Sequence, residues 1–218
     1  MRRLVAWLAL WLLAWPAAWA DEGQECIPRI VSAQVARSAD GARPVEGWEP
    51  VTLPDMWERR WPGYSGTVWY RIDWERAGAA CSARPAELGL GIDGIGIAGE
   101  VFINDDLLWR DASLAEPLSR SWNVPRWWLL PASSLREGTN TVWVRVVGVA
   151  ALSSGLVGTL RLGDAADVAR AQEQAQWRQR TVYFVNAVLA GMAAALFLLV
   201  WGLRRQERAY GWFALMSL

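Results

Sequence analysis

The sequence predicts a mainly β domain, an antiparallel sandwich or barrel, followed by a helix and then by a membrane-spanning helix. Three observations predict this order. From about residue 24 to residue 163, short runs of alternating apolar and polar residues are separated by clusters of Gly and Pro. From Asp164 to Arg180, the sequence is rich in Ala, Gln, Glu and Arg, which favour helix. From Val182 to Leu203, it is almost wholly apolar.

The strands are predicted from a period of two, which is typical of a strand with one buried face. The clearest example is Thr141–Val146, where three valines alternate with Trp143 and Arg145. Asn104-Asp105-Asp106 is a turn signal that closes a hairpin. The same alternation predicts strands in five further runs: Val68–Trp74, Leu88–Ile92, Val101–Ile103, Leu107–Trp109 and Leu160–Leu162.

The composition limits the class of protein. The chain has 218 residues, of which 53% are apolar, so we expect a packed core rather than general disorder. The 22 basic and 22 acidic residues balance, which gives no electrostatic reason to expect nucleic-acid binding. The absence of His excludes a His-based metal site or a Ser-His-Asp triad within these residues. No cofactor or metal is expected, because Asp105 and Asp106 belong first to a turn and supply too few oxygen ligands for calcium.

The N-terminus has the features of an export signal, which we predict as residues 1–20. Two arginines, at positions 2 and 3, form its positive region, and the apolar run Leu4–Trp15 is too short to cross a bilayer comfortably. Ala18-Trp19-Ala20 supplies the small residues of a cleavage site. An uncleaved membrane anchor is the alternative.

The sequence contains two cysteines, Cys26 and Cys81. Export would place them in an oxidising compartment, where we expect them to form a disulfide. In the chain-entropy model, closing a loop of this length adds about 4 kcal/mol to stability. Two buried free thiols are the alternative.

The two helical segments have different predicted roles. Asp164 can cap the first helix. Residues 164–180 contain only Val168 and Trp177 as large apolar residues, so we expect a connector helix at the membrane surface. Residues 181–203 are predicted to be a transmembrane helix, because roughly 22 helical residues span about 30 Å of hydrocarbon.

Positive charge predicts the orientation. Arg204, Arg205 and Arg208 follow the span, in a loop predicted as residues 204–208. By the positive-inside rule this end is cytoplasmic, which places the β domain outside. Residues 209–218 are apolar again, and we expect them to begin a second transmembrane helix, truncated here; an amphipathic tail on the inner leaflet is the alternative. The lipid membrane is therefore a predicted partner.

Several motifs, taken in order over about residues 48–163, resemble the sugar-binding jelly roll of family 2 glycoside hydrolases. They are Val51-Thr52-Leu53-Pro54-Asp55-x-Trp57, Gly66-Thr67-Val68-Trp69-Tyr70-Arg71, Gly99-Glu100-Val101-Phe102-Ile103-Asn104, Trp122-Asn123-Val124-Pro125, Leu130-Pro131 and Leu135-x-x-Gly138-x-Asn140-x-Val142-x-Val144-Arg145. The resemblance implies a galactose-binding-like jelly-roll β-sandwich for residues 21–163. In those hydrolases the jelly roll is not the catalytic module, so the resemblance implies no enzymatic activity here.

The order of a jelly roll, a helix, a span, a short basic loop and a second span resembles bacterial seven-transmembrane receptors with diverse intracellular signalling modules. This resemblance implies a sensor in the bacterial inner membrane whose β domain is periplasmic. It also implies that an output domain, either a histidine kinase or a diguanylate cyclase, lies beyond residue 218. Signalling across a membrane makes a homodimer an expected arrangement.

Ligand-binding residues are expected in loops, because a rigid sandwich presents its recognition groups there. Flat aromatic faces and guanidinium groups suit a carbohydrate ring or an anionic small molecule. The candidates form two groups: Trp57, Arg59, Arg60, Trp61 and Tyr64, and the pair Trp127 and Trp128. The alternatives are that these tryptophans fill the core or rest against the membrane or a partner domain.

Three functions remain open from the sequence. The first is a sensor, in which the helix of residues 164–180 transmits a change to the span. The second is a membrane-tethered carbohydrate-binding module without a signalling role, and the third is a structural module that mediates dimerisation. Glycoside hydrolysis by a carboxylate pair is not expected, because no catalytic barrel follows the available acids: Asp93, Glu100, Asp105 and Asp106.

Overall fold

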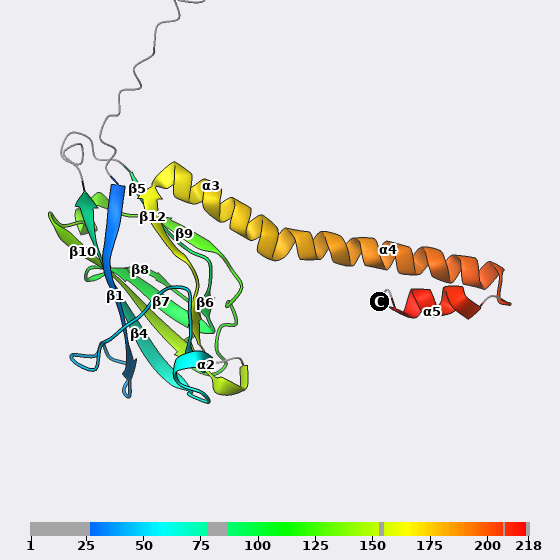
Figure 1. The fold of residues 1–218 in the computed structure, drawn as a ribbon, viewed down its shortest axis with the longest axis horizontal. Coiled ribbons are helices and arrows are strands. Elements are labelled where there is room, and N and C mark those ends of the chain that lie inside the picture. Colours follow the sequence, from blue (N-terminus) through cyan, green and yellow to red (C-terminus); the bar gives the residue numbers. More distant parts are fainter. Residues whose placement is uncertain (1–26, 78–86, 153–154, 207, 217–218) are drawn as a thin grey trace, which may run out of the picture.

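The computed structural model describes residues 27–77, 87–152, 155–206 and 208–216. A β-sandwich is followed by one long helix that leaves it, and a shorter helix folds back along the far part of that helix (Figure 1). The predicted fold class, a mainly β domain with a long apolar helix at its C-terminal end, is confirmed. The predicted export signal, residues 1–20, and both cysteines, Cys26 and Cys81, lie outside the described residues.

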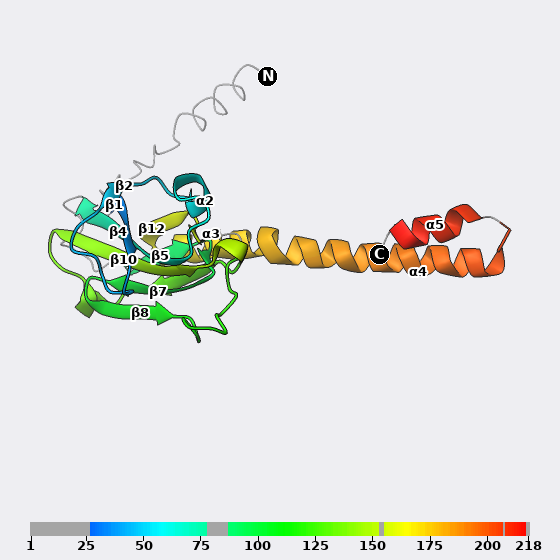
Figure 2. The same ribbon diagram turned by 90° about the horizontal axis from the view of Figure 1, so that it is seen from below.

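The strands form three antiparallel sheets. The largest is six-stranded, in the order β2 (Glu49–Pro50), β1 (Ile27–Ser38), β4 (Gly66–Ala77), β10 (Thr139–Gly148), β7 (Ala98–Ile103) and β8 (Asp106–Arg110). Two three-stranded sheets complete the sandwich, with the orders β3 (Asp55–Met56), β11 (Leu156–Val157), β6 (Ile95–Gly96), and β12 (Leu160–Asp164), β5 (Leu88–Ile92), β9 (Arg126–Leu129). Figure 2 shows these sheets from a second side.

The core lies between the large sheet and the two small ones. On β10, buried and half-buried residues alternate, and three of its valines, at 142, 144 and 146, are fully buried. They pack in one cluster with buried residues of β4, β5 and β7, among them Ile72, Leu90 and Val101. All six strands predicted from the alternation are present, as β4, β5, β7, β8, β10 and β12.

The Asn140 side chain fixes the start of β10 by bonding to nearby backbone. Its side-chain oxygen accepts a hydrogen bond from the Arg136 backbone N–H at 2.8 Å, and its amide donates to the Arg136 carbonyl at 2.9 Å. Asn104, in the β7–β8 turn at φ 53°, donates to the same Asn140 oxygen at 2.9 Å. This buried amide pair ties the β7–β8 turn to the start of β10, the strand beside β7 in the large sheet.

The helices are short in the sandwich and long beyond it. α2 (Trp57–Arg60) and the 3₁₀ turns η2 (Ala132–Ser134) and η3 (Ala150–Leu152) belong to loops. α3 (Ala165–Gln176), a π-helical turn η4 (Trp177–Thr181) and α4 (Val182–Leu203) then run on without a break. The C-terminal helix is α5 (Arg208–Met216).

The predicted cap of the long helix is confirmed. The Asp164 side chain accepts a hydrogen bond from the Ala166 backbone N–H at 2.9 Å. From Ala165 to Leu203 the helix has 39 residues, and within the described part of the chain it is the one helix that is long and apolar enough to cross a membrane. α5 lies antiparallel to α4 (Figure 1); that it begins a second span stays a prediction.

α3 packs closely on the sandwich. The sequence predicted only a connector helix at the membrane surface, with few large apolar residues to bury. Its buried residues, Ala165, Val168, Gln172 and Ala175, form one stripe along the helix. The stripe lies on β5, where Leu88, Leu90 and Ile92 point into the core and Gly89 and Gly91 point outward to the helix. We call this contact the α3 seam.

Glycine is what allows the α3 seam to close. A Cβ on Gly89 would lie 3.1 Å from the Ala165 backbone, and a Cβ on Gly91 would lie 3.1 Å from Val168 Cγ1. The Gln172 amide donates to the Ile92 carbonyl at 3.1 Å. The seam is therefore held by close backbone approach and one buried hydrogen bond rather than by large apolar side chains.

Candidate functional site

An open cleft of about 740 Å³ lies beside α2 and includes part of the predicted ligand region. One wall is the segment of residues 50–56, which joins β2 to β3, and the other is α2 with Arg59 and Arg60. We call it the α2 cleft. In Figure 1, α2 lies at the end of the sandwich away from the start of α3.

A buried polar chain forms the base of the α2 cleft. Trp57 is fully buried, and its indole N–H donates to the Tyr70 hydroxyl at 2.9 Å. Tyr70 in turn donates to Asp55 Oδ2 at 2.7 Å. The other oxygen of Asp55 lies 3.6 Å from Arg60, and Arg60 lies 3.5 Å from Glu49. The carboxylate is thereby balanced by one phenol and one guanidinium.

Burial and the neighbouring Asp55 carboxylate raise the pKa of Tyr70 well above its ordinary value. The phenol therefore stays protonated and keeps donating to Asp55. Trp57 and Tyr70 thus act as supports beneath the cleft. For Trp57, the structure shows the core-filling alternative, because a side chain with 0% exposure cannot meet a ligand.

The charged donors available to a ligand at this cleft are the two arginines. Arg59 is exposed and has no ion pair within the described residues. Arg60 points its guanidinium to Asp55 and Glu49, and its buried Nε has no hydrogen-bond partner within the described residues. Guanidinium donors suit a carboxylate or several hydroxyl groups, so the cleft has the chemistry for a polar or anionic ligand.

Trp61 and Tyr64 lie next to the cleft but do not line it. Their ring centroids are 6.0 Å apart, and the Arg37 guanidinium lies over both rings, at 5.2 Å and 5.6 Å. The Tyr64 hydroxyl donates to the Thr67 carbonyl, and burial raises the pKa of this phenol. Their faces already contact other protein groups, so these two residues hold the loop in place.

Trp127 and Trp128 lie on strand β9 and not in a loop, and they do not meet the α2 cleft. Successive residues of a strand face opposite sides. Trp127 is 42% exposed, whereas Trp128 turns inward and packs against Trp109 with centroids 5.8 Å apart. The structure therefore separates the two groups of candidate residues and also the two tryptophans of the pair.

The available acids do not form a free carboxylate pair. Asp93 is bound by both terminal nitrogens of Arg161, and buried Glu100 is bound by Arg110 and Arg145. Asp105 is likewise paired with two arginines. Within the described residues, no group of three or more Asp, Glu, Cys or His residues could hold a metal ion.

The sequence reasoning missed Asp55 and Glu49 as parts of this region. Asp55 was placed only in a structural motif, and the Pro50–Leu53 wall carries no chemical signal of its own. The sequence nevertheless contained a signal for Asp55. If Trp57 enters the core, Asp55 is partly buried with it and needs polar partners. Only the strand pairing of β3 with β11 shows where that Asp lies.

Comparisons with known proteins assign no family to this chain. No protein-family model matches the sequence, and no curated protein matches it. Among solved structures, the chain is similar to a family 2 β-galacturonidase from Eisenbergiella tayi bound to glycerol, at 15% identity and a TM-score of 0.43 over 63% of this chain and 24% of that one. It is also similar to a β-glucuronidase from an uncultured Clostridium sp., at 14% identity and 0.41 over 56% and 22%.

A further similar structure is a glycosyl hydrolase family 2 member from Bacteroides cellulosilyticus, at 16% identity and a TM-score of 0.42 over 63% of this chain and 21% of that one. The chain thus spans less than a quarter of the length of these three enzymes. At this level of similarity the matches assign neither an activity nor a ligand, and the fold rests on the strand pairings described above.

Proposed function

We propose that this chain is the membrane-anchored, ligand-sensing part of a receptor. The sandwich binds a ligand outside the membrane, and the continuous helix α3–η4–α4 carries the resulting change into the bilayer. The observation that carries this proposal is that the helix does not hang from a flexible linker. It is docked on the sandwich at the α3 seam and runs directly into the apolar helix α4.

The α3 seam supports transmission because it leaves little room for adjustment. With Gly89 and Gly91 beneath the helix, side chains and backbone are already in contact, and packed interfaces shift between discrete arrangements rather than deforming smoothly. A second contact lies further along, where the Asn123 side chain donates to the Gln179 carbonyl in the π-helical turn at 3.4 Å. Both contacts couple the sandwich to the helix before the apolar part begins.

One strand pairing, followed by a continuous stretch of chain, links the α2 cleft to the seam. Asp55 and Met56 of the cleft pair with β11. The chain continues from β11 through β12 to the cap residue Asp164 and into α3. A ligand that draws Arg59 or Arg60 toward itself would move β3 against β11, and the chain would carry that movement to the helix. The ligand must favour one arrangement to have this effect.

The proposed orientation rests on the three arginines that follow α4, which outnumber the two just before it, Arg178 and Arg180. The loop of residues 204–208 carries three arginines and one acid, which by the positive-inside rule places it in the cytoplasm. The sandwich would then be on the periplasmic side of a bacterial inner membrane. An output domain, a histidine kinase or a diguanylate cyclase, would follow residue 218, as the resemblance to seven-transmembrane receptors implies.

The test measures hydrogen exchange of the full chain in lipid nanodiscs, with D-galactose and D-glucuronate as probes for a neutral and an anionic carbohydrate. We expect D-glucuronate to bind and to change the exchange rate of residues 165–181. Arg59→Gln should weaken binding roughly tenfold by removing a charge-assisted hydrogen bond. The matched control is Arg120→Gln, which removes an exposed arginine outside the cleft and should leave binding unchanged.

The alternative function is a membrane-tethered carbohydrate-binding module without signalling. The open, polar α2 cleft favours it as much as it favours the sensor. Saturating carbohydrate binding with unchanged exchange in residues 165–181 would support the tether and contradict transmission. Absence of binding by either probe would contradict carbohydrate recognition at the cleft.

A further inference from the structure

The turn between α4 and α5 forms a second pocket, of about 470 Å³, far from the sandwich (Figure 1). Its walls are apolar, with Leu198 and Trp201 from α4 and Trp212 and Leu215 from α5. Its charged lining consists of two arginines, Arg205 and Arg208. We call it the hairpin pocket.

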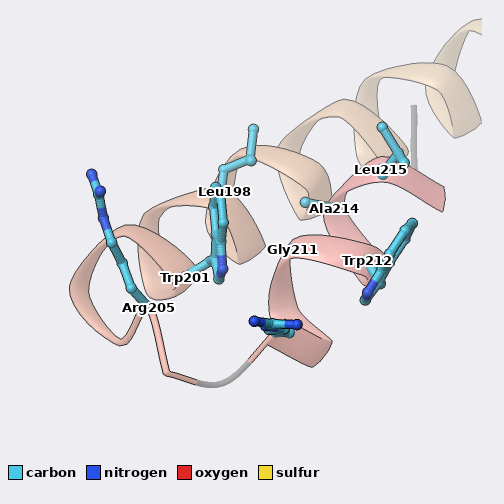
Figure 3. Close-up of a pocket in the computed structure, with 8 residues that line it drawn as sticks. Leu198, Trp201, Arg205, Gly211, Trp212, Ala214 and Leu215 are labelled. Carbon is cyan, nitrogen blue, oxygen red and sulfur yellow. The ribbon is translucent and has the colours of Figure 1, made fainter.

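Small residues on α5 create the space. A Cβ on Gly211 would lie 3.2 Å from the Trp201 ring, so the indole lies close over the α5 backbone at this point. Figure 3 shows Leu198 and Trp201 of α4 beside Gly211 and Ala214 of α5, with Arg205 where α4 ends. The helices themselves are held together through Phe197, which stacks on Tyr210 and Phe213. The pocket therefore lies beside an already packed contact.

The charge of the pocket is positive and without a partner in the described part of the chain. Arg205 and Arg208 are exposed, and neither forms an ion pair with a described residue. The loop of residues 204–208 contains three arginines and one acid, Glu207, which lies outside the described residues, so the loop is net +2. By contrast, Arg170 on α3 is paired with Asp167.

We propose that the hairpin pocket binds an anionic phospholipid, with the phosphate on Arg205 and Arg208 and the first acyl carbons against Leu198, Trp201 and Leu215. This inference rests on the proposed anchoring of α4 in a membrane. One guanidinium group can donate to two phosphate oxygens at once, and tryptophan side chains favour the level of the lipid headgroups. A soluble anion would leave the apolar wall uncovered, whereas a phospholipid matches both halves of the pocket.

The location agrees with such a ligand. α4 has 22 residues and a length of about 33 Å, which matches the hydrocarbon core. The pocket lies at its last two turns and the following loop, where hydrocarbon gives way to headgroups. Each arginine near an anionic lipid surface contributes roughly fivefold in affinity, so we expect the pair to contribute roughly 25-fold.

The experiment is native mass spectrometry of the full chain in detergent, titrated with phosphatidylglycerol and, separately, with phosphatidylcholine. The wild type should bind the first lipid at least tenfold more tightly than the second. Arg205→Gln with Arg208→Gln should remove this preference, and Arg205→Lys with Arg208→Lys should retain most of it. The matched control is Arg178→Gln with Arg180→Gln, which removes two exposed arginines at the other end of α4 and should leave the preference intact.

Equal loss in both glutamine variants would overturn the proposal, because it would show general charge attraction. Absence of a phosphatidylglycerol preference in the wild type would overturn the proposal as well. A dimer that forms without lipid and prevents phosphatidylglycerol from binding would also overturn it. A separate measurement isolates the premise. If the chain does not partition into phosphatidylcholine vesicles, the membrane anchoring itself fails; if it partitions but shows no headgroup preference, only the lipid site fails.

Discussion

α3 and α4 are consecutive parts of one helix, yet the polar part is the one that packs on protein and the apolar part is the one that stays exposed. α3 is polar in sequence, and it packs one face against the sandwich. α4 is apolar, and only Ala194 is buried in it, while Met192 is 65% exposed. The comparison shows that the apolar part of the helix is left largely uncovered by protein, whereas the polar part docks through a narrow stripe of mostly small residues and one buried amide.

The difference has a physical origin in what each helix meets. Among the described residues, α5 is the element that packs along α4, and it does so over only part of the length of α4, so the stability of α4 depends on the solvent around it. α3 meets a strand whose outward positions, Gly89 and Gly91, carry no side chain. Backbone-to-backbone approach then replaces the apolar stripe that a docked helix usually needs. Four predictions test this contrast.

The largest effect is expected from a charge in the apolar half. Met192→Arg places a guanidinium near the middle of α4 and should raise the free energy of membrane insertion by about 3 kcal/mol. Gln174→Arg, on the exposed side of α3, should not change insertion. The fraction of full chain that resists carbonate extraction from membranes measures both. Equal insertion of the two variants would contradict the assignment of lipid to α4.

The next effect concerns the docked half. Gly89→Val should overpack the α3 seam, because its Cβ would already lie 3.0 Å from Val168 Cβ. The cost of about 2 kcal/mol should speed hydrogen exchange in α3 roughly 30-fold. Gly163→Ala is the matched control, since its Cβ would make only an ordinary contact, 3.7 Å from Val168. If both variants exchange like the wild type, α3 is not docked as described.

A smaller effect is expected at the cap. Asp164→Ala removes the acceptor of the Ala166 N–H and should cost about 1 kcal/mol in the free energy of opening the first turn of α3. Asp167→Ala removes an exposed pair with Arg170 and should cost only a few tenths of a kcal/mol. Exchange rates of residues 165–169 distinguish them. The same loss in both would mean that the first turn responds to charge and not to capping.

The smallest loss of stability is expected at Gln172, because only one of its two polar side-chain atoms has a hydrogen-bond partner within the described residues. Its amide nitrogen donates to Ile92, but its buried oxygen has no partner within the described residues. Gln172→Met loses the hydrogen bond and removes the unpaired oxygen, so the net loss should be only about 0.5 kcal/mol. Gln176→Met, at an exposed position, should cost nothing measurable by exchange. A loss of several kcal/mol at position 172 would show that the amide dominates the seam.

The sequence carried much of the fold because alternation and apolar length are local signals. The valines of β10 and the apolar run of α4 were predictable from spacing alone. β1, with 12 residues, was not predicted as a strand, because Pro28 and its mixed polar residues hide a period that the pairing with β4 imposes. The outward glycines of β5 were visible, but the partner that needs them, α3, lies more than 70 residues away.

The candidate site was harder to predict because its parts come from separate strands. Arg59 and Arg60 do line a cleft, whereas Trp57 enters the core and Tyr64 packs on its own loop. Trp127 lies on another part of the sandwich. A loop rich in aromatic residues and arginine indicates a recognition surface, but the composition does not tell which rings are buried in the core and which stay exposed. The strand register decides this, and register is a long-range property.

The central claim is that the sandwich and the apolar helix move as one body through α3. Double electron–electron resonance on the full chain in nanodiscs tests this claim by measuring the distance between two spin labels, which replace Glu137 on the sandwich and Leu196 on α4. The account predicts one narrow distance distribution, which should broaden when Gly-Gly is inserted after Gln174. A distribution in the wild type as broad as in the insertion variant would contradict it.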